Sequence, residues 1–398
     1  MSELSYQTAG ESHGPGLIAM VTGAPAGVPI DVDAINEQMR RRQGGYGRGG
    51  RQRIEHDAIE IISGVRQGLT IGSPIALLVK NKDNRLDDAE RTPPLFRPRP
   101  GHADLAGAIK YLTPDCRGVL ERASARETAA KVAAGGVARM ILRALDIEVF
   151  GFVRAIGGEA TGAEVTPDNR AEMLAARDAS DTYSPDAEAT QRQRAVIRKA
   201  KEDKDTVGGL IEVHVFNVPI GLGTCMDRQD SLDSRLAAAV MGVQAMKGVE
   251  IGLGMAVADL PGSRVHDQIE YEKGVHDRTL GFRRPTNRAG GLEGGMSNGQ
   301  PIVVRAAMKP ISTLLRGLPS VDLRSGEPMD SQYERSDVCA VSAASVVVEH
   351  AVAFEIARAA LTKFGGDTID EVRTRLWTFQ KAGALIPQMG EEPGEPIA

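Results

Sequence analysis

The spacing of apolar residues along the chain predicts short strands and long helices of small residues. Seven segments are rich in β-branched residues or alternate between apolar and polar positions, as strands do. We predict strands at 17–21, 59–63, 75–80, 147–155, 208–218, 249–258 and 302–308, with 59–63 and 75–80 paired as a hairpin.

Three helices rich in alanine and other small residues are predicted in the same way. Ser124 and Glu127 match a capping box ahead of an Ala-rich run, which predicts a helix over 125–144. Similar runs predict helices at 232–246 and 340–363. Because these helices carry few charges on any face, burial between two layers explains them better than a surface position does. We therefore expect sheets on both sides of them.

Two segments and the C-terminal tail differ from this pattern. Residues 166–204 are dense in charged side chains, and Thr166-Pro167 and Ser184-Pro185 favour helix starts, so we predict a solvated helical insertion. Residues 259–285 are charged and irregular, which is typical of a mobile loop. The tail 389–398 is rich in Glu, Gly and Pro and is expected to be flexible.

Composition and charge exclude several classes of protein. The 398 residues are 41% hydrophobic and 25% charged, which is ordinary globular usage and rules out a disordered or disulfide-scaffold protein. The 48 Lys and Arg against 53 Asp and Glu leave a net charge of −5, so we expect neither nucleic acid nor a membrane as partner. Three cysteines lie far apart, and we find no secretory leader and no long uncharged apolar window. We therefore expect a cytoplasmic protein.

A basic segment near the N-terminus is the first candidate binding site. Guanidinium groups at high density repel one another unless anions sit nearby, and each binds phosphate or carboxylate with paired hydrogen bonds. A small substrate with several negative charges is therefore the expected partner. Residues 40–53 contain six arginines and no acid: Arg40, Arg41, Arg42, Arg48, Arg51 and Arg53.

Residues 40–53 are also compatible with three other interpretations. The spacing Gly45-x-Gly47-x-x-Gly50 matches a dinucleotide fingerprint, but it follows a helix-like segment instead of an apolar strand, so we discard it. An RNA-binding segment rich in Arg and Gly is normally longer, repeated and disordered. A solvated basic loop is the third interpretation.

Two histidines lie in settings that suit acid chemistry. His13 is flanked by glycines in the segment 10–16, which lets the imidazole approach a ligand closely, and histidine donates a proton near neutral pH. His102 follows two prolines and precedes a predicted short helix, whose dipole disfavours a cationic imidazole. A turn histidine and a helix-capping histidine are the structural alternatives.

Further segments are typical of phosphate sites. They are the helix entrance 122–126, the glycine loop 290–299, the cluster 309–313 and the segment 334–337. A cap or a turn explains each one alone, but their number favours one or more phosphate-bearing ligands. The five other histidines have no metal-ligand spacing, so we predict no catalytic metal.

Seven motifs together resemble the chorismate synthase family of the shikimate pathway. They are GESHG, RRQGGYGRGGR, RPGHADL, RASARETA, GGMSNG, KPIST and YERSDVCAV, in the family's order from about residue 10 to residue 364. The resemblance implies an α/β (α+β) fold, a β-α-β sandwich with central Ala-rich helices between antiparallel sheets and the helical insertion at its periphery. It also implies one catalytic domain over 1–388 and a homotetramer. One departure is Ser342, where the family pattern leads us to expect proline.

The resemblance implies a carbon–oxygen lyase of aromatic amino acid biosynthesis. Its reaction would be the anti-1,4-elimination of phosphate from 5-enolpyruvylshikimate 3-phosphate to give chorismate. Reduced FMN (FMNH2) is implied as a cofactor that is not consumed, and NADPH as the candidate reductant for it. Another flavin enzyme, or an enzyme acting on a phosphorylated sugar, is the second interpretation.

The resemblance also implies roles for individual residues. His13 would protonate the leaving phosphate, His102 would protonate or hydrogen-bond the reduced flavin, and Asp337 would relay the proton at the flavin N5 side. The substrate arginines would be Arg42, Arg48, Arg51, Arg99 and Arg126. The FMN-binding residues would be Arg122, Ala123, Ser124, Gln244, Ala245, Gly294, Lys309, Pro310, Ile311, Ser312, Thr313 and Arg335.

Overall fold

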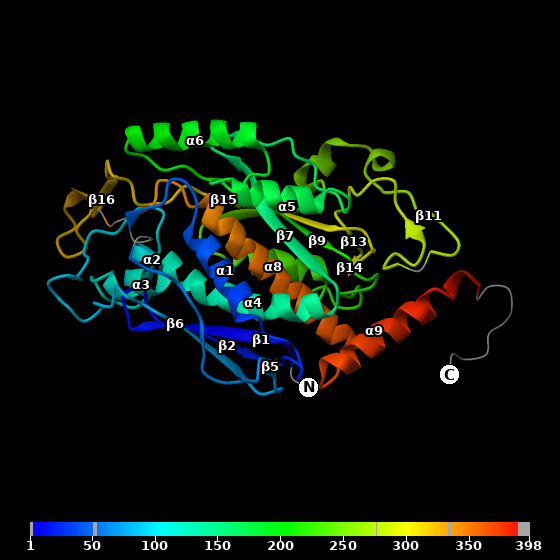
Figure 1. The fold of residues 1–398 in the computed structure, drawn as a ribbon. Coiled ribbons are helices and arrows are strands. Elements are labelled where there is room, and N and C mark those ends of the chain that lie inside the picture. The colour runs from blue at the N-terminus through cyan, green and yellow to red at the C-terminus, as the bar shows by residue number, and fades with distance from the viewer. Residues whose placement is uncertain (1–2, 51–53, 276, 333, 335, 389–398) are drawn as a thin grey trace.

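The structure, a computed structural model, describes residues 3–50, 54–275, 277–332, 334 and 336–388. Two larger sheets of the described chain enclose a layer of helices (Figure 1). Alternation along β2 places Leu17 and Val21 in the core and leaves Ile18 and Met20 exposed. The first sheet is antiparallel with the order β1-β2-β6-β3, where β1 is Ser5–Ala9, β2 Gly16–Thr22, β3 Glu60–Ile61 and β6 Ile75–Lys80.

The second sheet is also antiparallel and is covered on its outer side by the helical insertion. In Figure 1, α5 (Arg170–Ala179) and α6 (Ala187–Glu202) lie over this sheet. A cluster of three phenylalanines on β7 and β9 packs with Met173 and Leu174 of α5, so one face of the insertion is buried. The strand order is β10-β15-β9-β7-β8, with β7 at Glu148–Ile156, β8 at Glu159–Ala160, β9 at Gly209–Phe216, β10 at Met246–Ile251 and β15 at Ile302–Met308.

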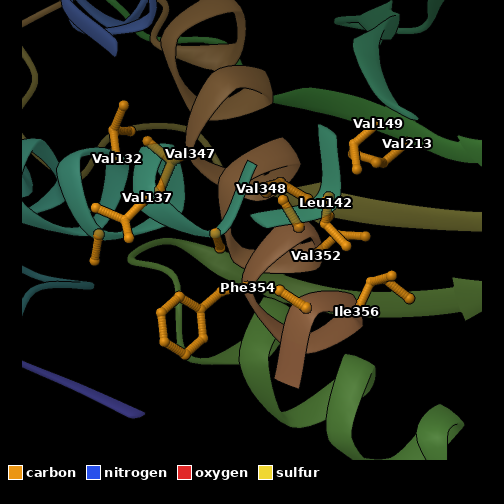
Figure 2. Close-up of a cluster of buried hydrophobic side chains, with 14 of the residues drawn as sticks. Val132, Val137, Leu142, Val149, Val213, Val347, Val348, Val352, Phe354 and Ile356 are labelled. Atoms are coloured by element: carbon orange, nitrogen blue, oxygen red, sulfur yellow. The ribbon is translucent and has the colours of Figure 1, made fainter. Parts of the chain in front are cut away.

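The helical layer is built on α4 (Thr128–Ala144) and α8 (Val341–Phe364). They pack against each other, with α1 (Val32–Gln43) and α7 (Leu232–Met241) beside them. Figure 2 shows Leu142 of α4 and Val348 of α8 on the side of the buried cluster that includes Val149 of β7 and Val213 of β9. Because α8 is surrounded by helices and the second sheet, nearly all its residues are buried, which explains why its sequence carries few charges.

A glycine allows the two central helices to approach closely. A Cβ at Gly135 of α4 would lie 2.5 Å from the His350 Cβ and 2.8 Å from the His350 carbonyl oxygen. No side chain fits at these distances without moving backbone. The small residues of the central helices are therefore a packing requirement.

Shorter elements complete the described chain. The helices are α2 (Asp104–Lys110), α3 (Arg117–Ala123) and α9 (Ile369–Gly383), with 3-10 turns at Ala125–Glu127, Gly254–Asp259, Gly262–Arg264 and Ile386–Gln388. The small hairpins are β4 (Val65–Arg66) with β5 (Leu69–Thr70), β11 (Glu270–Tyr271) with β12 (Phe282–Arg283), β13 (Leu292–Glu293) with β14 (Met296–Ser297), and β16 (Pro319–Val321) with β17 (Pro328–Asp330).

The predicted sandwich and its central helices are confirmed, but several boundaries differ. The helix predicted over 232–246 ends at Met241, because Gly242 caps it and Ala245 has φ +69°, outside the helical region. The helix predicted from 125 begins with a 3-10 turn. Its capping box is wrong, because the Glu127 carboxylate accepts from Thr8 Oγ1 at 2.6 Å and not from the chain at Ser124. The strand predicted over 249–258 is β10, and a 3-10 turn follows it.

Among its described residues, the segment 259–285 contains only 3-10 turns and the short β11–β12 hairpin as regular structure, and Asp267 ties it to the chain that follows. Asp267 accepts from Thr286 Oγ1 at 2.5 Å and from the amides of Arg288 and Ala289 at 2.9 Å each. These bonds fasten the middle of the segment to the chain that follows it. Its mobility stays a prediction, and the tail 389–398 lies outside the described residues.

Candidate active site

One cavity of about 530 Å³ collects most of the candidate residues. It lies where the last turn of α1 and the first two turns of α8 meet the loops after β1, α7 and β15. His13, His102 and Asp337 all line it. The predicted substrate and cofactor residues that line it are Arg42, Arg48, Arg99, Arg126, Ala123, Ser124, Gln244, Ala245, Lys309, Ile311, Ser312 and Thr313.

Arg42 and Arg126 are held by a shared carboxylate. Arg42 Nη2 pairs with Asp57 Oδ2, and Arg126 Nη1 donates to Asp57 Oδ1 at 2.6 Å. All three side chains are buried. Burial raises the pKa of the Asp57 carboxyl, but the two guanidinium groups outweigh burial and hold that pKa below its ordinary value. The two arginines are therefore oriented before any ligand arrives.

Arg48 and Asp337 join the glycine-rich loop to the start of α8. Arg48 Nη1 donates to Asp337 Oδ2 at 2.5 Å, and the Gly49 amide donates to Asp337 Oδ1 at 2.6 Å. A Cβ at Gly49 would lie 2.9 Å from the Ser336 carbonyl oxygen, so this approach requires glycine. A predicted substrate arginine and the predicted proton relay are thus direct partners.

His102 and Arg99 share Asp104. His102 Nδ1 lies 2.5 Å from Asp104 Oδ1, while Arg99 donates to the carboxylate from Nε at 2.8 Å and from Nη2 at 3.0 Å. His102 Nδ1 also lies 3.0 Å from Arg99 Nη2, which only donates, but its shorter contact is with the Asp104 carboxylate, which only accepts, and this favours a proton on Nδ1. Burial raises the pKa of Asp104, but the hydrogen bonds from His102 and Arg99 bring it well below its ordinary value. The dipole of the short helix that follows His102 disfavours a positive charge on the imidazole, and the Asp104 carboxylate offsets this effect.

His13 packs between α3 and the loop that follows β6. Its Nδ1 lies 3.0 Å from both carboxylate oxygens of Glu121. Its Nε2 lies 3.3 Å from Arg85 Nη2 and 3.7 Å from Asp83 Oδ2. The imidazole is thus a buried ring with an acid on one nitrogen and a mixed-charge pair near the other, and not a solvent-exposed turn residue.

Another part of the cavity suits a flat ring with polar edges. Gln244 Nε2 donates to Glu127 Oε2 at 2.7 Å, whereas its buried Oε1 accepts no hydrogen bond from the described residues. Lys309 Nζ donates to the Gly101 carbonyl at 2.9 Å, and burial lowers the Lys309 pKa. An unsatisfied acceptor beside apolar walls fits a flavin, whose ring carries N–H groups. The apolar walls come from Ala123, Val243, Ala340, Ala343, Ala344 and Val347.

Cationic side chains outnumber acidic ones among the residues that line the cavity. The described lining residues include six cationic side chains and three acidic ones. An excess of this sign attracts a ligand with several negative charges. The cationic set is Arg42, Arg48, Arg85, Arg99, Arg126 and Lys309, and the acidic set is Glu55, Glu334 and Asp337.

Some predicted site residues do not line this cavity. Arg122 donates to two backbone carbonyls at 3.0 and 3.1 Å. Gly294 is exposed at the turn between β13 and β14, and Pro310 is exposed between cavity residues of the KPIST motif. Arg51 and Arg335 lie outside the described residues. Their roles stay predictions.

The partners of the predicted residues are not evident from the sequence. Asp57, Glu121 and Arg85 lie in segments that no motif marks, and Asp104 lies inside the RPGHADL motif without a predicted role. The sequence could have indicated only that such partners exist, because buried arginines and histidines require counter-charges. This requirement does not say which acid of the chain supplies the charge.

Neither a metal centre nor a membrane span is found in the part of the chain that the structure describes. There, no three or more His, Cys, Asp or Glu side chains are grouped so that they could hold a metal ion. None of the described helices combines the length and the apolar character needed to cross a membrane.

Known proteins with similar sequences and structures share one description. The chorismate synthase family matches residues 4–361. The chorismate synthase of Desulforamulus reducens is 50% identical over 392 residues, covering 95% of this chain and 98% of that protein. That of Geobacter metallireducens is 51% identical over 384 residues, covering 93% of this chain and 96% of that protein. A crystal structure of a chorismate synthase matches with a TM-score of 0.78 at 38% identity, covering 96% of this chain and 98% of the other.

Proposed function

Because the chain belongs to the chorismate synthase family, which makes chorismate in the shikimate pathway, we propose that it eliminates phosphate from 5-enolpyruvylshikimate 3-phosphate with reduced FMN as cofactor. The reaction is an anti-1,4-elimination, which makes the enzyme a carbon–oxygen lyase. One observation carries the proposal: oriented arginines, two histidines with carboxylate partners and apolar walls share one cavity.

The arginines supply what this substrate needs. It carries a phosphate and two carboxylates, and guanidinium groups bind both with paired hydrogen bonds. Donors that are already oriented also stabilise the negative charge that develops on the departing phosphate. Buried carboxylates fix three members of the set in advance. The proposed substrate residues are Arg42, Arg48, Arg51, Arg99 and Arg126.

The titratable side chains have separate roles. His13 gives a proton to the leaving phosphate. His102, whose Nδ1 proton is held by Asp104, uses Nε2 to protonate or hydrogen-bond the reduced flavin. Asp337 relays a proton at the flavin N5 side.

The cavity offers partners for FMN beside the substrate arginines. Gln244 Oε1 is a buried acceptor, and the residues 309–313 bring Lys309, Ser312 and Thr313 to the cavity. When bound, reduced FMN would lend electron density to the breaking C–O bond and would regain it with the hydrogen lost from the substrate, a hydrogen that is not acidic enough for an ordinary side-chain base. NADPH is the proposed reductant for FMN.

Burial of the basic segment favours a small ligand over RNA. Arg41 and Arg42 are buried, and Arg48 pairs with Asp337 inside the cavity. An RNA-binding segment would present such arginines to solvent. We propose a cytoplasmic homotetramer, and the exposed Ile18 and Met20 on the outer face of the first sheet are apolar surface that another copy could cover.

Anaerobic incubation with chemically reduced FMN and 5-enolpyruvylshikimate 3-phosphate tests the function. We expect chorismate and inorganic phosphate in equal amounts, with no net oxidation of the flavin. His13→Ala and His102→Ala should each reduce turnover by about 100-fold or more at saturating FMN. Phosphate release without chorismate would indicate a different enzyme on this scaffold, and wild-type turnover in either variant would refute the histidine roles. Comparison with aerobic, NADPH-driven turnover tests the proposed reductant.

A further inference from the structure

The contacts of His13 determine which ring nitrogen carries the proton. Nδ1 lies 3.0 Å from each oxygen of the Glu121 carboxylate, which accepts hydrogen bonds. Nε2 lies 3.3 Å from Arg85 Nη2, and a guanidinium only donates. Both contacts are satisfied together by one neutral form, with the proton on Nδ1 and the lone pair on Nε2.

Glu121 is well placed to hold His13 in that form. It lies on α3, is 1% exposed, and also accepts from the His13 backbone amide at 2.9 Å. Burial raises the Glu121 pKa, but the hydrogen bonds and charge of His13, together with Arg117, outweigh burial and lower it. The Glu121 carboxylate is therefore ionised, and it contacts both the ring and the main-chain amide of His13.

Besides the bond from the His13 amide to the Glu121 carboxylate, the main chain around His13 is held by several bonds that do not use this side chain. The Ser12 amide donates to the Glu121 carbonyl at 3.0 Å, and Asn81 Nδ2 donates to the Gly14 carbonyl at 2.8 Å. The His13 carbonyl accepts from the Arg85 amide at 2.9 Å. A change confined to the carboxylate should therefore alter the ring and leave the backbone of the turn in place.

We propose that Glu121 is a positioning residue that keeps the Nδ1 proton on His13 and so dedicates Nε2 to proton exchange with the substrate phosphate. The proposal rests on the proposed function and extends it to a residue that contacts no ligand itself. In the reacting state the ring carries protons on both nitrogens, balanced by Glu121. As the C–O bond breaks, the Nε2 proton moves to the phosphate oxygen. The other proton stays on His13 Nδ1, hydrogen-bonded to Glu121. Solvent restores the Nε2 proton between turnovers.

The charged groups around the ring determine the expected pH dependence. Glu121 and Arg117 face it from α3, with Arg117 Nη1 at 3.7 Å from Glu121 Oε1. Asp83 and Arg85 face Nε2 from the loop after β6, and they pair with each other at 3.1 Å. Glu121 is therefore the main counter-charge on the Nδ1 side, where Arg117 opposes the imidazolium. Without the negative charge of Glu121, the doubly protonated His13 ring should form only at lower pH.

The pH profile of turnover in Glu121→Gln tests the proposal. The amide keeps one acceptor oxygen and the size of the side chain but has no charge. We expect kcat at pH 7.5 to fall by about tenfold or more, with little change in KM, and the alkaline limb of the profile to move down by about one pH unit or more. Glu121→Asp should restore the wild-type position of that limb while recovering part of kcat. Glu355→Gln is the matched control, a buried carboxylate of α8 paired with Arg358 outside the cavity, and should keep the wild-type profile.

A nitrogen NMR spectrum of the wild-type protein tests the same proposal without any loss of function. In ligand-free protein with 15N-labelled histidine, the signals that disappear in His13→Asn should show the proton on Nδ1. A proton on Nε2, or a Glu121→Gln variant with wild-type kcat and profile, would overturn the proposal. If wild-type protein made no chorismate, the proposed function would fail while the tautomer would still be decided by this spectrum.

Discussion

Three buried carboxylates, Asp57, Asp104 and Glu121, hold the basic and titratable side chains of the cavity. In each case burial raises the carboxyl pKa and the paired groups lower it further than burial raises it. A buried charge without a partner is costly, whereas a paired and hydrogen-bonded charge is tolerated. These counter-ions lie behind the residues that line the cavity and hold its cationic side chains apart and aligned.

Asp57 is the most direct residue-level test of this arrangement. An amide in Asp57→Asn offers one acceptor oxygen, and its NH2 group faces a guanidinium that can only donate. We expect a loss of about 3 kcal/mol in the free energy of unfolding, because one partner of a buried ionic cluster is removed. KM for the substrate should rise about tenfold or more as Arg42 and Arg126 lose their orientation.

Denaturant unfolding and steady-state kinetics measure these two effects. Asp322→Asn changes a carboxylate that pairs with Arg324 away from the cavity, so both quantities should stay close to wild type. Wild-type stability and KM in Asp57→Asn would show that the two arginines do not depend on the shared carboxylate.

The sequence allowed the reacting side chains to be predicted, but not the groups that control them. His13, Arg42 and Arg126 lie in motifs rich in glycine or arginine, whose composition is itself unusual. Glu121 and Asp57 lie in ordinary sequence, and they are brought to their partners by the packing of α3 and of the chain before β3. A charge requirement can be read from a motif, whereas the identity of the partner depends on the fold.

At the level of elements, the insertion 166–204 braces the cavity from outside. The hydroxyl of Tyr183 donates to the Arg41 carbonyl at 2.8 Å, at the end of α1. Ser342 Oγ donates to the Thr182 carbonyl at 3.0 Å, at the start of α8. Ser342, the departure from the expected proline, thus uses its hydroxyl to fasten the insertion to the helix whose first turns line the cavity.

The contact between the central helices gives an element-level prediction. Gly135→Ala places a methyl group 2.5 Å from the His350 Cβ, so α4 and α8 must separate. We expect a loss of about 1–3 kcal/mol in stability, seen as a lower thermal midpoint. Gly118→Ala is the control, because a Cβ there meets nothing within 4 Å and alanine favours helix. Equal midpoints for Gly135→Ala and wild type would show that the crossing tolerates a wider spacing.

Long helices and strands could be predicted from the sequence, but their ends could not. The small-residue runs predict α4 and α8 because both sides of these helices are covered, and such burial leaves a strong signal. The end of α7 depends on Gly242 and on a backbone at Ala245 that reaches the cavity. The ends of such helices depend on the surrounding tertiary structure, which a local sequence pattern does not reveal.

At the scale of the whole molecule, the cavity is a product of the sandwich. Its lining runs from Ser12 to Val347, and the two sheets and the helices between them bring these distant segments together. The solved relative matches over 96% of this chain, so the arrangement of layers that forms the cavity belongs to the family fold. The central claim is that this single cavity holds the flavin and the phosphorylated substrate against each other, with His13 at the leaving phosphate.

A crystal structure of the protein with FMN and 5-enolpyruvylshikimate 3-phosphate bound together tests that claim most directly. We predict both molecules in the described cavity, with the flavin beside Gln244, the substrate carboxylates and phosphate on the arginines, and the phosphate within hydrogen-bond distance of His13 Nε2. Electron density that placed the two molecules in separate cavities, or the phosphate away from His13, would contradict the account.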